Sequence, residues 1–146
     1  MIVMKSSIMS ERASHEEFKT NLERRTLAFA IGTVNALSSL PNRQVLNVIV
    51  GQLAKSATSI GANYREANRA ESKSDCIHKI GIVCKEASET VYWLEILLKA
   101  QVLTQEQKLP FESLTTEANE LLALFKSISR SLRATSTTEK NNAIPQ

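Results

Sequence analysis

Apolar residues recur every three or four positions along most of this chain, and this spacing predicts amphipathic α-helices. A first helix is predicted over residues 14–38, followed by a turn at Pro41-Asn42 and a second helix over residues 43–70. The predicted core positions of the first helix are Phe18, Leu22, Phe29, Thr33, Ala36 and Leu40. Those of the second helix are Ile49, Leu53, Ala57, Ile60, Tyr64 and Ala67.

A third helix is predicted over residues 72–100, where Ser72 followed by Asp75 resembles an N-terminal capping box. Its predicted core positions alternate steps of three and four: Ile77, Ile80, Cys84, Ala87, Val91, Leu94 and Leu98. A fourth helix begins at a second candidate capping box, Thr104 with Gln107, and we expect Pro110 to divide it. The main segment after this division carries Leu114, Ala118, Leu121, Phe125, Ile128 and Leu132.

Short connections between long helices favour antiparallel neighbours, so these elements predict an all-α, up-down-up-down four-helix bundle over residues 14–133. We expect residues 1–13 to be flexible and residues 134–146, which are rich in Thr, Ser and Asn, to form a disordered polar tail. The 146 residues suit one domain. No apolar run reaches the roughly 18 residues that a membrane-spanning helix needs.

Charge and cysteine content add little about function. The formal net charge is +3, which by itself implies no partner. Cys76 and Cys84 are eight residues apart, or about 12 Å along a helix, which is too far for a disulfide. We expect both to be small buried residues in a reducing compartment. The chain start is too short for a signal peptide, so we expect a cytoplasmic protein.

Catalytic and metal-binding patterns are weak in this sequence. All four glycines fall inside helical patterns, so no glycine-rich phosphate loop is indicated. A di-iron bundle would need two Glu-x-x-His motifs, whereas the chain offers one Asp-x-x-His, at Asp75 and His78, and a second histidine at His15. We therefore expect no enzyme activity, no metal and no cofactor.

Two surfaces are candidates for interactions. The outward face of the third helix carries large apolar side chains beside acidic ones, and we interpret it as an oligomer interface unless a helix of the same bundle covers it. Its members are Ile82, Glu86, Glu89, Trp93, Ile96 and Leu97. At the end of the second helix, Arg65, Arg69 and Lys73 form a basic corner that suits a phosphate backbone or, alternatively, a solvated helix end.

Two further polar residues are interpreted as structural. Asn63 falls near the edge of the second helix's core face and is a candidate for fixing helix register. Glu95 falls within the predicted core face of the third helix, so it needs a partner, for which Arg24 or Arg25 is the candidate.

The sequence over residues 52–67, 72–80 and 85–95 resembles the bacterial four-helix-bundle proteins that are encoded in intervening sequences of 23S ribosomal RNA genes. The resemblance extends over about residues 25–133 and departs from the family at Cys76, where an aromatic residue is usual. It implies a homopentameric ring without enzyme activity or catalytic residues. A relative in the same superfamily, the accessory variability protein of diversity-generating retroelements, binds a reverse transcriptase and presents a basic surface to nucleic acid.

Three hypotheses follow. The first is a non-catalytic oligomeric scaffold that binds RNA, DNA or a nucleic-acid enzyme through Arg65, Arg69 and Lys73. The second is an adaptor that binds only proteins, and the third and weakest is a metal-dependent bundle enzyme. No membrane contact and no small-molecule substrate are expected.

Overall fold

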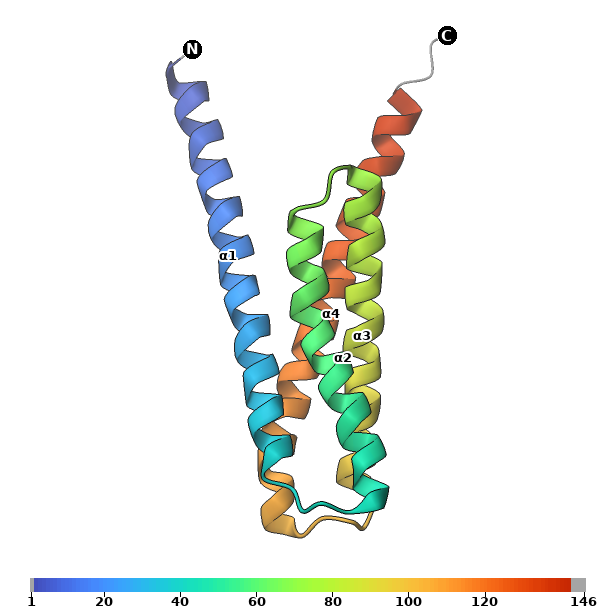
Figure 1. Ribbon diagram of the computed structural model, residues 1–146. Coiled ribbons are helices and arrows are strands. Elements are labelled where there is room, and N and C mark those ends of the chain that lie inside the picture. Colours follow the sequence, from blue (N-terminus) through green and yellow to red (C-terminus); the bar gives the residue numbers. More distant parts are fainter. Residues whose placement is uncertain (1, 143–146) are drawn as a thin grey trace.

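The computed structural model describes the backbone of residues 2–142 and the side chains of residues 10–138. This part of the chain forms four α-helices and no strand, so the predicted all-α fold is confirmed. The helices are α1 (Ile2–Ser38), α2 (Gln44–Asn68), α3 (Lys73–Lys99) and α4 (Gln105–Asn142). The α1–α2 and α3–α4 connections lie at one end of the molecule and the α2–α3 connection lies at the other (Figure 1).

Capping residues define two of the helix starts, as the sequence predicts. The Ser72 hydroxyl accepts a hydrogen bond from the Asp75 amide at 3.0 Å, at the start of α3. At the start of α4 the bonding is reciprocal: Thr104 Oγ1 accepts from the Gln107 amide at 3.3 Å, and Gln107 Oε1 accepts from the Thr104 amide at 3.0 Å. These bonds satisfy amides that have no partner within the first turn of a helix.

The helices are longer than the sequence pattern indicates. α1 begins at Ile2 and α4 continues to Asn142, where we expected a flexible start and a disordered tail; residues 1 and 143–146 lie outside the described residues. The expected division at Pro110 is wrong, because α4 runs through this residue without a break. Pro110 lies near the start of the helix at an exposed position, where a missing amide costs one hydrogen bond near solvent.

A continuous apolar core runs along the inner faces of the helices. All six predicted core positions of α2 are buried, and Tyr64 packs edge-to-face against Phe125 of α4 with ring centroids 5.2 Å apart. Gly61 of α2 is also buried, and there α2 lies close to α1: a Cβ on Gly61 would lie 3.1 Å from Thr26 Oγ1. The glycine therefore permits close approach of the two helices.

The core seam of α3 is shifted from the predicted one. Its buried residues are Ile80, Val83, Ala87, Thr90, Leu94 and Leu97. Three of these are predicted positions, whereas the other three each lie one residue before a predicted position that is only half-buried. Thr90 occupies the seam in place of the more apolar Val91 because its hydroxyl lies 3.0 Å from Ser56 Oγ of α2 and 2.8 Å from the Glu86 carbonyl oxygen. A polar side chain is tolerated in a core when it is hydrogen-bonded.

Helix α1 is the most loosely packed of the four. It packs on α2 and α4, least extensively on α4, and it leans away from the other helices toward its N-terminal end (Figure 1). The predicted core residue Phe18 is consequently 45% exposed. The second half of α1 makes the contacts with the core, through Leu22, Thr26, Phe29, Thr33, Ala36 and Leu37.

Candidate interaction surfaces

The predicted basic corner is held against α1 by Glu23. Arg65 of α2 donates from Nη2 to the Glu23 carbonyl oxygen at 2.9 Å and from Nη1 to the Gly61 carbonyl oxygen at 3.0 Å. The Glu23 carboxylate lies 3.9 Å from Arg65 Nε and 3.6 Å from Arg69 Nη1, and it accepts a hydrogen bond from Asn68 at 3.0 Å. Arg65 is therefore half-buried between two helices, whereas the Arg69 side chain stays 68% exposed.

Acidic groups surround the cations at this corner. Glu66 pairs with Lys79, and this carboxylate raises the pKa of the lysine. Arg65, Glu66, Arg69, Glu71, Asp75 and Lys79 together line one shallow hollow. Lys73 is half-buried at the start of α3. Because charges of both signs alternate here, the corner has a weaker positive potential than its three cations suggest in the sequence.

Five of the six residues of the predicted α3 interface share the outer side of the helix. Ile82, Glu86, Glu89, Trp93 and Ile96 are half-buried on the outer side of the helix. Leu97 does not belong to this face, since it is fully buried; it lies about 100° around the helix from Ile96 and enters the core seam. Trp93 Nε1 donates to Glu89 Oε1 at 3.2 Å, and the exposed ring of Tyr92 packs edge-to-face on Trp93.

The two polar residues have local partners. Asn63 is half-buried and its side-chain amide donates to the Ser59 carbonyl oxygen at 2.9 Å, within α2. The expectation that Glu95 lies in the core is wrong: it is exposed and forms an ion pair with Lys99 on α3. Arg25, one of its candidate partners, instead ties α1 to α4 through Glu117 and Glu120.

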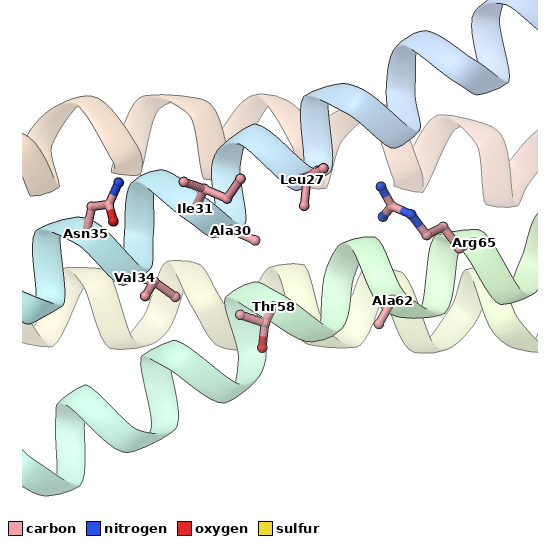
Figure 2. A pocket seen from close by; sticks show the side chains of 8 residues that line it. All are labelled: Leu27, Ala30, Ile31, Val34, Asn35, Thr58, Ala62 and Arg65. Atoms are coloured by element: carbon pink, nitrogen blue, oxygen red, sulfur yellow. The ribbon is translucent and has the colours of Figure 1, made fainter.

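A groove between α1 and α2 was not predicted. It is open, has a volume of about 630 Å³, and is lined mainly by apolar side chains: Leu27, Ala30, Ile31, Val34, Asn35, Thr58, Ala62 and Arg65. Figure 2 shows the α1 and α2 side chains facing the space between the helices, with the Arg65 guanidinium directed toward α1 at one end. Leu27, Ile31 and Val34 are 48%, 51% and 46% exposed. Their spacing of four and three residues, a second apolar stripe on this helix, was the signal available in the sequence.

A basic stripe on α4 was also missed. Lys126, Arg130 and Arg133 are exposed and spaced by four and three residues, so they share one face of the helix. No ion pair involves any of the three among the described side chains. This stripe, rather than the corner around Arg65, is the concentrated positive surface in the described part of the molecule.

Neither cysteine forms a disulfide. Cys76 and Cys84 are free thiols that are half-buried rather than fully buried, and burial raises the pKa of both. Among the described side chains, no three His, Cys, Asp or Glu residues are grouped so that they could hold a metal ion. Within the same range, none of the helices has the length and apolarity needed to cross a membrane.

Comparisons with a family model and with solved structures both find relatives of this chain. The sequence model of a family described as 23S rRNA-intervening sequence protein matches residues 12–127. The crystal structure of a protein of unknown function from the S23 ribosomal protein family of Bacteroides thetaiotaomicron superposes with a TM-score of 0.67. That protein is 40% identical, and the match covers 77% of this chain and 97% of the other. No curated protein matches. The chain belongs to the family of 23S rRNA-intervening sequence proteins.

Proposed function

We propose that the protein is a non-catalytic, cytoplasmic scaffold in which antiparallel four-helix bundles assemble into a pentameric ring. The ring binds nucleic acid, or a nucleic-acid enzyme such as a reverse transcriptase, through its basic surfaces. Neither a small-molecule substrate nor a cofactor has a part in this role.

The observation that carries the proposal is the apolar surface left uncovered along α1 and α2. Leu27, Ile31 and Val34 are each about half exposed along one side of α1. Val45 and Val48 of α2 are 68% and 63% exposed. A stripe of exposed apolar side chains like the one on α1 is rare on a protein that works as a monomer and is typical of an interface.

A closed ring of five copies needs two different faces on each copy, because each contact joins one face to the other. The chain offers two such faces. One is the α1–α2 groove, and the other is the outer side of α3 with Ile82, Trp93 and Ile96. Five copies also repeat each cluster of cations five times, which strengthens binding to a long polyanion through multivalency.

The alternative function is an adaptor that binds only proteins. The apolar lining of the groove favours it, because an apolar groove between two helices is a common site for a partner helix. A pull-down after nuclease treatment separates the two functions, since an adaptor keeps its partner when nucleic acid is removed.

Absolute mass by light scattering, recorded with the 260/280 nm absorbance ratio of the same peak, tests the proposal. Five copies of the 16.2 kDa chain have a mass of about 81 kDa, and bound nucleic acid raises both the mass and the ratio. We expect Ile31→Lys and Trp93→Asp each to give a folded, helical species of lower mass, with Leu109→Lys, at an exposed site outside both faces, as the control. A wild-type peak near 16 kDa with the ratio of a pure protein would contradict the assembly.

A further inference from the structure

Charge is distributed unevenly along α4. Its first half carries one cation, Lys108, and four carboxylates, two of which are paired with Arg25 of α1: Glu106, Glu112, Glu117 and Glu120. Residues 121–138 contain no Asp or Glu and carry the basic stripe, Lys126, Arg130 and Arg133. In the two residues that follow, the charges of Glu139 and Lys140 cancel each other. The second half of α4 is therefore positive and the first half negative.

The stripe lies against α3, which adds a fourth cation. Arg133 Nη2 lies 3.9 Å from the place that a Cβ would take on Gly81, so the guanidinium lies against α3 where that helix has no side chain. Lys85 is exposed one helical turn from Gly81, on the same side of α3. The positive charges of Lys126 and Arg133 also act on the Cys84 thiol, and both oppose the rise that burial causes in its pKa. Arg133 and Lys126 thus lie beside α3, and helical spacing puts Arg130 on their face of α4 and Lys85 on the side of α3 that carries Gly81.

We propose that Lys126, Arg130 and Arg133, with Lys85 beside them, bind the phosphate backbone of a nucleic-acid double helix without reading its sequence. Seven residues of α-helix are about 10.5 Å long, and phosphates on one strand follow each other every 3.4 Å or so along a duplex, so the stripe is as long as about three phosphates.

The side chains around the stripe suit a backbone contact. Three small side chains, Ser127, Ser129 and Ser131, lie between the cations in the sequence. They are too small to shield the charges. Phe125, the aromatic residue of this half of α4, is fully buried and cannot stack on a base. Contacts made by lysine and arginine to phosphates position a duplex and carry no sequence information.

This inference rests on the proposed nucleic-acid binding and gives it a location. Arg130 and Arg133 lie beyond residues 12–127, the range that the family model matches. The location also differs from the corner at Arg65 and Arg69, where Glu23 compensates the charge.

The test is the salt dependence of binding to a fluorescent DNA duplex of about 20 base pairs, measured by anisotropy. We expect the variant Lys126→Gln/Arg130→Gln/Arg133→Gln to bind at least about tenfold more weakly at low salt and to lower the slope of log K against log salt by about three. A matched control, Arg24→Gln/Lys55→Gln/Lys99→Gln, removes the same charge from exposed positions on α1, α2 and α3. We expect this control to keep the wild-type slope, and circular dichroism to show that both variants remain helical.

The outcomes separate the two proposals. If wild-type protein binds and the stripe variant keeps its slope, or the control loses as much, the stripe is not the site while nucleic-acid binding stands. If wild-type protein fails to bind the duplex at about 50 mM salt, duplex binding and the stripe are both refuted.

Discussion

Gly61 and Gly51 both lie in α2, but they differ in the space around them. A Cβ on Gly61 would lie 3.0 Å from Arg65 Nη1 and 3.1 Å from Thr26 Oγ1, closer than an ordinary contact. Thr26 cannot easily yield, because it is fully buried and its hydroxyl is bonded to carbonyl oxygens of its own helix. A Cβ on Gly51 would meet nothing within 4 Å.

We therefore expect opposite effects of alanine at these two positions. Gly51→Ala should raise the free energy of unfolding by up to about 1 kcal/mol, through helix propensity. Gly61→Ala gains the same propensity but crowds Thr26, so its free energy of unfolding should be about 1–3 kcal/mol below that of Gly51→Ala. Urea denaturation of the two variants measures this difference, and equal values would mean that α1 and α2 are not in tight contact at Gly61.

Predictions for single residues failed where two adjacent positions on a helix differ in burial. Ile96 and Leu97 were placed on one outward face, yet Leu97 is fully buried. Glu95 was placed in the core, yet it is exposed beside Lys99. Both errors follow from taking Val91 and Leu98 as seam positions, where the seam runs through Thr90 and Leu97. Val91 was predicted as the core residue because it is more apolar than Thr90. The hydrogen bond between Thr90 and Ser56 places Thr90 in the core instead, and this bond depends on the neighbouring helix α2.

At the scale of the element, the connection between α1 and α4 depends on one guanidinium. Arg25 Nε and Nη2 donate to the two oxygens of Glu117 at 2.6 and 2.8 Å, and Nη2 also donates to Glu120 at 2.6 Å. The hydrogen bond to Glu117 is the main cause that raises the pKa of Arg25. Because the packing of α1 on α4 is the least extensive in the bundle, this pair adds a polar attachment where apolar contact is small.

A double-mutant cycle with Arg25→Gln and Glu117→Gln measures that coupling. We expect about 1 kcal/mol at low salt, the upper end for partly exposed pairs, because the geometry is bidentate. Added salt should reduce the coupling. The pair of Lys19 and Glu16, three residues apart on α1, is the control, with an expected coupling of about 0.3 kcal/mol. Equal couplings would show that the cross-helix pair adds nothing to the attachment of α1.

The starts of α3 and α4 and the α2 core face were predictable because their causes are local. The capping side chains of α3 and α4 act within three residues, and α2 has one apolar face. The core face of α1 was harder to predict, because Leu27, Ile31 and Val34 form a second apolar stripe beside the core stripe. Pattern alone does not say which stripe faces the bundle. The stripe of Lys126, Arg130 and Arg133 was missed for a different reason: its charges are visible in the sequence, but their exposure depends on which side of α4 packs on α3.

At the scale of the whole molecule, stability should fall as the pH rises above about 9. Burial raises the pKa of Cys76 and Cys84 from the ordinary value of 9.0, and that of Tyr64 from 10.0. The folded state therefore binds more protons than the unfolded state in this range, so its stability is fully present below pH 9 and is lost as the pH rises through the folded pKa values.

Denaturant titrations at pH 8 and pH 10 measure this loss, and we expect a lower free energy of unfolding at pH 10. In the variant Cys76→Ala/Cys84→Ala the decrease between the two pH values should be smaller, with Ser88→Ala, an exposed α3 position, as the control. An unchanged decrease in the cysteine variant would mean that the two thiols do not contribute to it.

The loose attachment of α1 has a consequence for the order in which the chain folds. α2, α3 and α4 share the most extensive packing and bury most of the core, so they form the cooperative unit of highest stability. α1 is connected to that unit by a short turn, a close approach at Gly61 and the Arg25 network. Its backbone amides should exchange with solvent through a local opening that leaves the other three helices intact, which makes α1 the last helix to dock and the first to detach.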